Sequence, residues 1–402
     1  MSMQLRTLAH LGDSRGKRVL LRVDWNVPME RSRIVDDTKI RLSLPTLAAL
    51  RASGAAVIVV SHLREGATGD TLAPAVRAAG RLLGGRRPTL VRTAVGSPTL
   101  LRVCRALRPG AVLVLENIRR YPGEERNERA FARTLAALAD VYVNDAFAAC
   151  HRRHASVAAV ADYLPAVAGL LLQREVEVLQ RVLEQPAHPM IALMGGAKIA
   201  TKAPVIDRLR RSASAVLLGG GLANTVWAVR GYGIGASLVD SDAAPVVRQL
   251  LRARRHGAVR MPVDVVVGDP SARGRGHRVV PVGPRPHVIC ERPEAVLDIG
   301  PATIRAYSAE LRTAATMVWN GPMGWLECSP FHYGSVMLAR VIASRASGRA
   351  FGVVGGGETL AALQQTQMAQ YIDHVSSGGG AMLAFLGGEA LPGLLPLYRT
   401  GA

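Results

Sequence analysis

Lysine is almost absent from this chain. Only four of its 50 lysine and arginine residues are lysine, at positions 17, 39, 198 and 202. Arginine replaces lysine easily on a solvated surface, but the two differ where a compact ammonium group must meet a phosphate. Lys198 and Lys202 follow the glycine pair Gly195-Gly196. Two of the four lysines therefore remain next to a flexible backbone, although arginine is preferred almost everywhere else in the chain. This segment therefore predicts a phosphate-binding site.

Cysteine and long apolar runs are scarce as well. The four cysteines are widely separated and form no Cys-x-x-Cys pair, which indicates neither a zinc site nor a disulfide framework. The longest apolar candidate for a membrane span, residues 157–172, is interrupted by Asp162 and Pro165. The first ten residues lack the pattern of a signal peptide. We therefore expect a cytoplasmic protein with reduced thiols and no membrane partner.

Aromatic residues make up only 4% of the chain, whereas the formal net charge is +20. A basic surface attracts nucleic-acid backbones regardless of sequence, but single-strand binding also uses aromatic side chains for base stacking. The basic residues recur along most of the chain without forming an arginine-rich tail. We interpret the charge as an arginine-biased, solvated surface that suits a small anionic substrate, and nucleic acid is not an expected partner.

The length of 402 residues exceeds what one hydrophobic core supports, and a hydrophobic content of 49% supplies material for two domains. Short apolar runs end in polar or glycine-rich residues, and helix-like segments such as 130–139, 222–229 and 335–344 separate them. This alternation predicts an α/β fold with two parallel sheets and ligands at the carboxyl ends of the strands. The runs are residues 18–23, 56–60, 111–115, 141–143, 191–194, 215–218, 263–267, 317–319 and 351–354.

The strand ends differ between the two halves of the chain. Cations, His, Asn and Asp follow the runs of the first half, which suits a small polyanion, whereas glycines and lysines follow those of the second half, which suits a nucleotide. This division predicts an enzyme with two substrates, one on each domain. Residues 170–185, preceded by Gly169 and closed by Pro186, read as a long helix that links the domains.

Six longer motifs follow one another in an order typical of one family. They are Arg22-Val-Asp-Trp-Asn-Val-Pro28, Leu115-Glu-Asn-Ile-Arg119, Ala139-Asp-Val-Tyr-Val-Asn-Asp-Ala-Phe147, Gly195-Gly-Ala-Lys198, Val318-Trp-Asn-Gly-Pro-Met-Gly324 and His374-Val-Ser-Ser-Gly-Gly-Gly-Ala381. On these motifs the chain resembles the phosphoglycerate kinase family over nearly its whole length.

The resemblance implies a fold and a domain organisation. It implies two Rossmann-like, three-layer α/β/α domains with parallel sheets. The first, residues 1–169 with 387–402, would bind a small carboxylate substrate, and the second, residues 186–386, would bind Mg-ATP. Residues 170–185 would form the interdomain helix, and we expect a monomer.

For the second domain, the resemblance implies ATP or ADP and Mg²⁺ as cofactors. Lys198 would hold the ADP phosphates, and Lys202 would reach the transferred phosphoryl group. Because Pro204 is best tolerated in the first turn of a helix, a helix is expected to begin near Thr201 and to point its N-terminus at phosphate. Glu358 would be the metal ligand. The other nucleotide-binding candidates are Gly196, Ala197, Gly219, Gly220, Gly221, Asn320, Pro322, Glu327, Gly355, Gly356, Gly357 and Thr359.

Phosphoryl transfer requires positioning and charge neutralisation rather than a covalent nucleophile. The catalytic candidates are therefore Lys39, Lys202 and the backbone N–H groups of Gly356 and Gly357. Ser61 lies next to His62, but neither an orienting acid nor a nucleophile elbow accompanies the pair, so a nucleophilic serine is not expected.

For the first domain, the resemblance implies that the acceptor binds to Asp24, Asn26, His62, Arg119 and Arg152. Two departures from the family pattern concern this acceptor site. Lys39 stands where the family carries an arginine, which keeps the charge but loses the fork geometry. Glu65 stands where, in the family, an arginine helps to hold the substrate's non-transferred phosphate.

Two further departures concern the nucleotide side. Glu358 replaces an aspartate, and Trp325 replaces a smaller residue of the adenine pocket. Four functions therefore stay open: phosphoglycerate kinase, a paralogue that activates another carboxylate as an acyl phosphate or acyl adenylate for ester or amide formation, an impaired binding protein on the same fold, and a nucleic-acid binder. Lys198, Lys202 and the triple glycines speak against the impaired protein.

Overall fold

A computed structural model describes residues 4–31, 33–63, 71–84, 87–252 and 257–399 of the chain. The chain forms two compact units, which are Met1–Glu177 with Ala390–Ala402, and Val178–Glu389. The boundary between them falls inside helix α6 (Leu170–Glu184), which occupies all but the last residue of the segment expected to link the domains.

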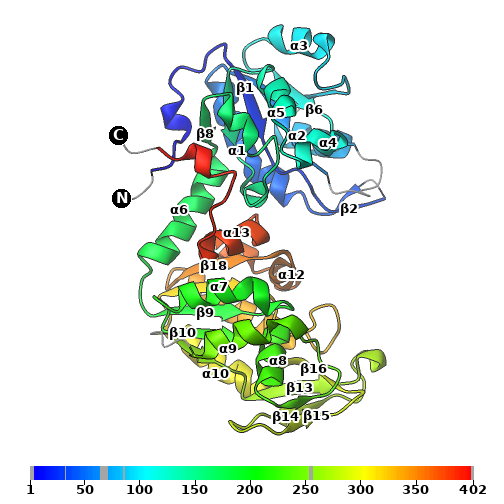
Figure 1. The fold of residues 1–402 in the computed structure, drawn as a ribbon, viewed down its shortest axis with the longest axis vertical. Coiled ribbons are helices and arrows are strands. Elements are labelled where there is room, and N and C mark those ends of the chain that lie inside the picture. The colour runs from blue at the N-terminus through cyan, green and yellow to red at the C-terminus, as the bar shows by residue number, and fades with distance from the viewer. Residues whose placement is uncertain (1–3, 32, 64–70, 85–86, 253–256, 400–402) are drawn as a thin grey trace. The chain divides into compact units, whose positions relative to one another are not determined.

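The first unit is built on a six-stranded parallel sheet with the strand order β5-β6-β4-β1-β7-β8 (Figure 1). Its central strands are apolar and buried, as expected for a sheet covered on both faces. The strands are β1 (Arg18–Arg22), β4 (Ala56–Val60), β5 (Thr89–Val91), β6 (Val112–Leu115), β7 (Val141–Asn144) and β8 (Ala166–Ala168), with a small hairpin of β2 (Met29–Glu30) and β3 (Arg33–Ile34). The helices are α1 (Thr38–Ala52), α2 (Ala73–Leu82), α3 (Pro98–Arg105), α4 (Pro122–Glu125) and α5 (Arg129–Ala136).

The second unit contains another six-stranded parallel sheet, with the order β12-β10-β9-β17-β18-β19. These strands are β9 (Met190–Met194), β10 (Ala215–Leu218), β12 (Ala258–Arg260), β17 (Thr316–Asn320), β18 (Phe351–Gly355) and β19 (His374–Val375). The helices are α7 (Ile199–Leu209), α8 (Gly220–Val229), α9 (Ala244–Arg252), α10 (Pro301–Thr313), α11 (Tyr333–Ala346), α12 (Gly357–Thr366) and α13 (Gly379–Gly387). The predicted α/β fold with parallel sheets is confirmed.

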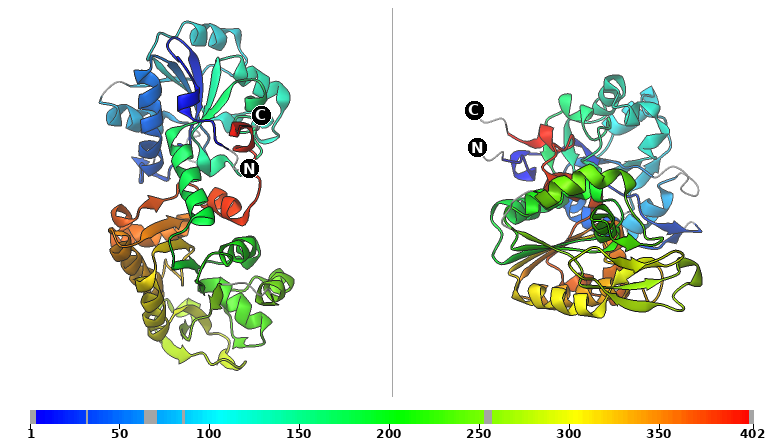
Figure 2. Two further views of the ribbon diagram at one scale, coloured as in Figure 1. Left: turned by 90° about the vertical axis from the view of Figure 1, so that its left-hand side faces the viewer. Right: turned by 60° about the horizontal axis from the view of Figure 1, so that its bottom comes forward.

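One expected parallel strand belongs to a different sheet. Residues 263–267 read as a buried strand of the parallel sheet, but β13 (Asp264–Gly268) pairs antiparallel with β14 (Arg278–Pro281) and β16 (Ala295–Ile299). This three-stranded sheet lies at the opposite end of the second unit from α13 (Figures 1 and 2). A further pair is formed by β11 (Gly233–Ile234) and β15 (Val288–Cys290).

The first and last described segments of the chain lie side by side on the first unit (Figures 1 and 2). The amide of Arg6 donates to the carbonyl of Leu397 over 2.7 Å, and Leu5 forms a bridge with Tyr398. The amide of Gly393 donates to the carbonyl of Cys150, which lies two residues before the candidate site residue Arg152. The last residues of the chain therefore brace the part of the first unit that carries candidate site residues.

Helix α6 begins on a buried carboxylate. Oδ1 of Asp145 accepts the amides of Leu171 and Leu172 over 2.9 and 3.3 Å, and Oγ1 of Thr46 accepts the amide of Leu170. These bonds satisfy three donors that every helix leaves free at its start. A side chain at Gly169 would place Cβ 2.2 Å from Oδ1 of Asp145, so the approach to the helix requires glycine.

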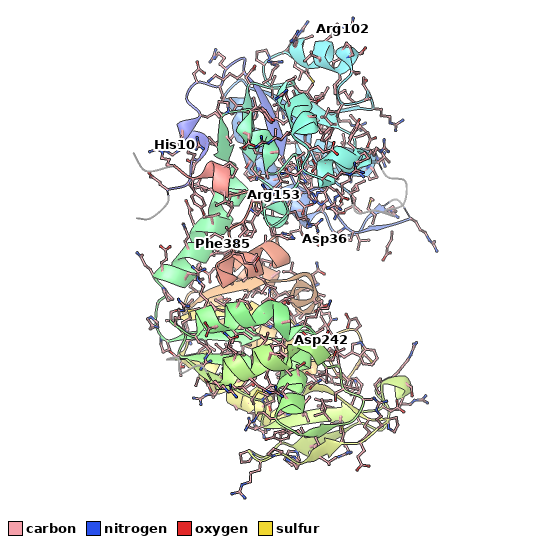
Figure 3. All side chains as sticks on the ribbon, viewed as in Figure 1. His10, Asp36, Arg102, Arg153, Asp242 and Phe385 are labelled. Atoms are coloured by element: carbon pink, nitrogen blue, oxygen red, sulfur yellow. The ribbon has the colours of Figure 1, made fainter. Side chains whose placement is uncertain are left out.

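No helix of the described residues is long and apolar enough to cross a membrane. Arginine side chains are spread over the surface; Arg102, for example, extends outward from α3 (Figure 3).

Candidate active site

The acceptor candidates of the first unit lie at one edge of the sheet, because the four strands that they follow are neighbours. The sheet places β6, β4, β1 and β7 side by side and parallel, so their carboxyl ends share one edge. Asp24 and Asn26 follow β1, His62 follows β4, Arg119 follows β6, and Arg152 follows β7. The arrangement brings anion-binding side chains together, as a site for a small polyanion requires.

Lys39 joins this cluster from the first turn of α1. Its Nζ lies 2.7 Å from Oδ2 of Asp24, and the lysine side chain is one-third exposed. The ion pair holds the ammonium group at the strand edge while leaving part of it open to solvent.

His62 is buried and hydrogen-bonded to an arginine. Nη2 of Arg22 lies 3.1 Å from Nδ1 of His62. Because a guanidinium only donates, Nδ1 must accept and the ring proton must sit on Nε2. Burial and then the charge of Arg22 hold the pKa of His62 well below its ordinary value, although Asp24 opposes this. His62 is therefore a neutral donor through Nε2.

Arg119 carries donors without a partner. Its Nε and Nη2 are buried and have no hydrogen-bond partner among the residues that the structure describes. Oε1 of Glu125 lies 3.1 Å from Nε but is not aligned for a hydrogen bond. Buried donors of this kind are costly unless a ligand satisfies them, so Arg119 suits a phosphate or carboxylate.

Two residues of this cluster had no role in the sequence-based prediction. Arg22 is 1% exposed and is held by Ser156, whose hydroxyl donates to Glu124. His154 is half-buried, and burial followed by Arg119 and Arg152 lowers its pKa to about 4. The signal for His154 was its position two residues after Arg152. The charge of Arg22 strengthens the positive potential of the cluster. The lowered pKa of His154 keeps its imidazole ring neutral at pH 7.

Glu65, the substitution expected to oppose the acceptor's phosphate, lies in the segment 64–70 and so outside the described residues.

Some of the nucleotide candidates of the second unit line a cavity of about 390 Å³. This volume lies within the range of ordinary small-molecule sites. Of the expected residues, seven line the cavity: Gly196, Ala197, Gly220, Gly221, Pro322, Glu327 and Glu358.

Two glycines allow close packing at this site. Gly196 has φ +88°, and a Cβ there would lie 2.9 Å from Nζ of Lys202. Gly356 has φ +103° and precedes α12, and a Cβ there would lie 3.1 Å from Nδ2 of Asn320. Both backbone conformations are unfavourable for residues with side chains. The glycines therefore leave room for the ammonium group of Lys202 and for the start of α12.

Lys202 is a buried cation. It is 8% exposed, and its Nζ donates to the carbonyl of Gly195 over 2.5 Å. Burial lowers its pKa to about 8, although the nearby Glu358 opposes the shift. Lys198 in contrast is exposed at the residue before α7. A charged, desolvated ammonium group binds phosphate more strongly than a solvated one.

Three further nucleotide candidates make contacts that hold the strand ends around the cavity in place. Nδ2 of Asn320 donates to the carbonyl of Gly355, and Oγ1 of Thr359 accepts the amide of Gly321. Gly219 packs on Met323, whose Sδ would lie 2.5 Å from an added Cβ. Asn320 and Thr359 are buried, so their contacts fix the strand ends that carry the cavity walls.

The helix boundaries differ from the expectation. Helix α7 begins at Ile199 rather than near Thr201, which leaves Pro204 inside the helix. Proline cannot donate to the carbonyl four residues earlier, so the first turns of α7 lose one backbone bond. Helix α12 begins at Gly357, so Gly357, Glu358 and Thr359 form its first turn instead of preceding it. The amides of this turn have no partner within the helix and face the N-terminal end, where anions bind.

A magnesium ion brought in by a nucleotide fits this site. Among the described residues, no three His, Cys, Asp or Glu side chains form a group that would hold a metal ion. Mg²⁺ commonly uses one or two carboxylates together with substrate phosphates and water. The exposed carboxylate of Glu358 lines the cavity near Lys202 and suits that role.

Part of the cavity lining is apolar. Leu238, Val296, Leu297 and Trp325 line it, and Leu238 is 61% exposed. Asn224 also lines the cavity and donates through Nδ2 to the carbonyl of Val296. Neither Lys198 nor Lys202 lines the cavity, but its lining combines glycines and two carboxylates with apolar side chains, as the two parts of a nucleotide require.

Comparisons with known proteins agree with this architecture. A family model described as phosphoglycerate kinase matches residues 9–389. The phosphoglycerate kinase of Roseiflexus castenholzii is 44% identical over 393 residues, which cover 96% of this chain and 97% of the relative. That of Desulforudis audaxviator is 46% identical over 392 residues, covering 96% of this chain and 98% of the relative.

Solved structures agree as well. The phosphoglycerate kinase of Coxiella burnetii superimposes with a TM-score of 0.84 at 34% identity, covering 98% of this chain and 99% of that one. The enzyme of Pyrococcus horikoshii gives a TM-score of 0.83 at 29% identity and covers 98% of each chain.

The fold and these relatives define a two-unit α/β protein of the phosphotransferase class, with a carboxyl group as acceptor. The chain belongs to the phosphoglycerate kinase family. The resemblance predicted from the motifs is thereby confirmed.

Proposed function

We propose that the protein catalyses the reversible transfer of the γ-phosphoryl group of ATP to the carboxylate of 3-phosphoglycerate, giving 1,3-bisphosphoglycerate and ADP. An oxygen of the acceptor carboxylate forms a bond to the γ-phosphorus, and the bond from that phosphorus to the β–γ bridging oxygen breaks. No proton is transferred in this step, so positioning and charge neutralisation account for catalysis. The observation that carries the proposal is the pair of sites, one with unpartnered guanidinium donors and one with a buried lysine.

In the first unit, Arg119 would bind an anionic group of the acceptor through Nε and Nη2, which have no hydrogen-bond partner among the described residues although Nε lies in an ion pair with Glu125. His62 would donate from Nε2 and, being neutral, would add no charge of its own. Lys39, held by Asp24, would meet the carboxylate, while Asn26 and Arg152 would complete the pocket.

In the second unit, Lys202 would neutralise charge on the transferred phosphoryl group, and Lys198 would contact the ADP phosphates. The amides of Gly356 and Gly357 would donate to the same group at the start of α12. Glu358 would hold Mg²⁺, which supplies charge neutralisation on the phosphate oxygens when it is bound.

The alternative, a paralogue that activates another carboxylate, is not favoured. The relatives reported above are all phosphoglycerate kinases, and they align over nearly the whole chain. The substitution at Lys39 keeps a cation paired with Asp24, which supports retention of an acidic acceptor.

A cytoplasmic location and a monomeric state complete the proposal. All four cysteines are free, and three of them are buried, which is typical of a reducing compartment. Light scattering of the purified protein would measure the oligomeric state.

The test is a coupled assay of ADP formation from Mg-ATP with a panel of carboxylates. We expect turnover with 3-phosphoglycerate and little with acceptors that lack its C3 phosphate. Lys39→Arg is expected to change the apparent KM for 3-phosphoglycerate by less than about tenfold, because the charge is kept. Glu65→Arg is expected to leave the affinity unchanged or to improve it. Turnover with another carboxylate and none with 3-phosphoglycerate would contradict the proposal and favour the paralogue.

A further inference from the structure

A row of buried polar side chains lies behind His62. It consists of Arg22, Ser156 and Glu124, whose exposed fractions are 1%, 1% and 0%. Arg22 is the last residue of β1, Glu124 lies in α4, and Ser156 belongs to the segment that follows β7. Polar groups are costly to bury unless they are hydrogen-bonded, so the bonds of this row show what it holds in place.

The donors of the row determine the direction of each hydrogen bond. Nε of Arg22 lies 2.9 Å from Oγ of Ser156, and a guanidinium group can only donate. The hydroxyl oxygen of Ser156 therefore accepts from Arg22, and its single proton is donated to Oε1 of Glu124 over 2.6 Å. Oε2 of Glu124 accepts the amide of Ser156 over 2.8 Å. Glu124 thus holds Ser156 by two bonds, and Ser156 holds one edge of the guanidinium group.

The other nitrogens of Arg22 are also engaged. Nη1 donates to the carbonyl of Val23, and Nη2 lies 3.1 Å from Nδ1 of His62. Because each of the three guanidinium nitrogens has a partner, the planar group has one orientation. A proton on Nδ1 of His62 would point at a group that cannot accept it. The orientation of Arg22 therefore places the ring proton on Nε2.

Other charged groups also act on the imidazole ring of His62. Oδ1 of Asp24 lies 3.9 Å from Nδ1 and favours a proton on the ring, whereas Arg119 and Arg152 oppose one. If Arg22 were displaced, Asp24 would remain beside Nδ1 as a group that can accept its proton. The position of the Arg22 guanidinium group therefore decides between the two neutral forms of the ring.

We propose that Ser156 and Glu124 are positioning residues of the acceptor site, which hold Arg22 so that His62 keeps its proton on Nε2. The inference rests on the proposed function, because it takes the ligand of His62 to be an anionic group of the acceptor. A donor on Nε2 can bind an anion, whereas the other tautomer presents a lone pair there and repels it. Neither positioning residue has to contact the acceptor itself.

The experiment removes the hydroxyl group that joins Arg22 to Glu124. In ¹H–¹⁵N NMR spectra without substrates at pH 7, His62 of the wild type is expected to show only the Nε2–H tautomer, and a His62→Asn spectrum assigns its signals. Ser156→Ala is expected to give a mixture of the two tautomers. The KM for 3-phosphoglycerate should rise by about tenfold to a hundredfold, as when the partner behind a ligating histidine is lost, while the KM for ATP changes by less than about twofold.

Two conservative variants separate the hydrogen bonds from the packing. Glu124→Gln keeps the volume of the side chain, but its amide nitrogen cannot accept, so one of the two bonds to Ser156 is lost. It should shift the tautomer of His62 in the same direction and raise the KM for 3-phosphoglycerate by about threefold to thirtyfold. Ser156→Thr keeps the hydroxyl group and should retain the wild-type tautomer, with a KM within about threefold of the wild-type value.

A serine at the other end of β1 supplies the matched control. Ser14 is 3% exposed, precedes β1 and donates to Oγ of Ser53 over 2.6 Å. Ser14→Ala therefore removes a buried hydroxyl group of the same unit without touching the row behind His62. It should leave the tautomer of His62 and both KM values unchanged. Thermal denaturation establishes that each variant is folded at the temperature of the assay.

Two results would overturn the inference. An unchanged Nε2–H tautomer in both Ser156→Ala and Glu124→Gln would show that other contacts hold Arg22. A mixture of tautomers with an unchanged KM for 3-phosphoglycerate would show that the acceptor does not depend on the proton at Nε2. If the wild type fails to turn over 3-phosphoglycerate, the proposed function is wrong, but the NMR comparison needs no substrate and still decides whether Ser156 and Glu124 position His62.

Discussion

Burial of Lys202 disfavours the charged form of its side chain. Burial lowers its pKa from the ordinary 10.5 to about 8, so the folded chain binds fewer protons than the unfolded chain between these values. Stability contributed by this site therefore rises with pH through that window, and the charged form is unfavourable at neutral pH. A group that destabilises the fold yet remains buried beside glycines and Glu358 is typical of a functional site.

Replacing Lys202 by Met is expected to separate stability from activity. Loss of the ammonium group should lower kcat by about 10²–10³-fold, because charge on the transferred phosphoryl group is no longer neutralised. The free energy of unfolding at neutral pH should rise by about 1–3 kcal/mol, since a buried charge is removed. Urea denaturation and steady-state kinetics measure the two effects. Lys17→Met, which changes a lysine at the opposite end of β1 from Asp24, should alter neither. A less stable Lys202→Met would contradict this interpretation.

Arg119 is expected to act through its fork geometry. Arg119→Lys keeps the charge but cannot donate two parallel bonds, so the KM for 3-phosphoglycerate should rise by about tenfold to a hundredfold with a smaller change in the KM for ATP. The neighbouring, exposed Arg120 provides the matched variant Arg120→Lys, which should change either KM by less than about twofold. An equal effect of both variants would show that net charge alone holds the acceptor.

At the scale of single residues, the sequence analysis named residues that follow strands, and the fold brings them to one edge of the sheet, while their binding roles stay predictions. Their positions depend only on the order of strands and on the residue type. Arg22 and His154 were not assigned because their roles depend on contacts with residues far away in sequence, such as Ser156 for Arg22. The partner of Lys39 was likewise visible only once α1 and β1 had been placed together.

At the scale of secondary-structure elements, the buried and parallel strands were predicted well because they read as continuous apolar runs. The same signal misled for residues 263–267, since an apolar run of valines also suits the central strand of an antiparallel sheet. The start of α7 was predicted two residues late because Pro204 was taken as a first-turn residue, whereas packing of the helix overrides that preference. Local signals gave the elements, and tertiary contacts decided their pairing and ends.

The start of α6 supplies a prediction at this scale. Burial raises the pKa of Asp145 from the ordinary 3.8 to about 7, so the folded chain binds more protons than the unfolded chain between these values. Its contribution to stability is therefore greatest below about pH 4 and is lost as the pH rises through 7. Asp145→Asn keeps an acceptor for Leu171 and removes this titration, so its stability relative to wild type should improve by about 2–3 kcal/mol between about pH 5 and pH 8.

Chemical denaturation at a series of pH values measures the difference. The exposed Asp162 offers the control Asp162→Asn, whose stability relative to wild type should not vary with pH in this range. A constant difference for Asp145→Asn would mean that the carboxylate is charged in the folded chain throughout.

At the scale of the whole molecule, the chain combines two separate α/β units with a net charge of +20. Both proposed substrates are anions, so the excess of arginine should attract them before binding. We expect kcat/KM for 3-phosphoglycerate and for ATP to fall by about threefold to tenfold between about 20 and 200 mM salt. Stopped-flow or steady-state kinetics across this range would measure the effect, and independence from salt would contradict it.

The same charge permits a direct check on nucleic acid as a partner. A random oligonucleotide should bind weakly and lose its affinity steeply as salt rises, as a purely electrostatic contact does. Tight binding that persists at about 200 mM salt would show a dedicated nucleic-acid surface that the account does not include.

The central claim is that the protein joins the γ-phosphoryl group of ATP to the carboxylate of 3-phosphoglycerate. Trapping the product with hydroxylamine tests it most directly, since an acyl phosphate reacts to give a hydroxamate and an unreacted carboxylate does not. With Mg-ATP and 3-phosphoglycerate present, the account predicts one hydroxamate for each ADP formed, and loss of both in Lys202→Met. ADP formed without hydroxamate, or no ADP at all with 3-phosphoglycerate, would contradict it.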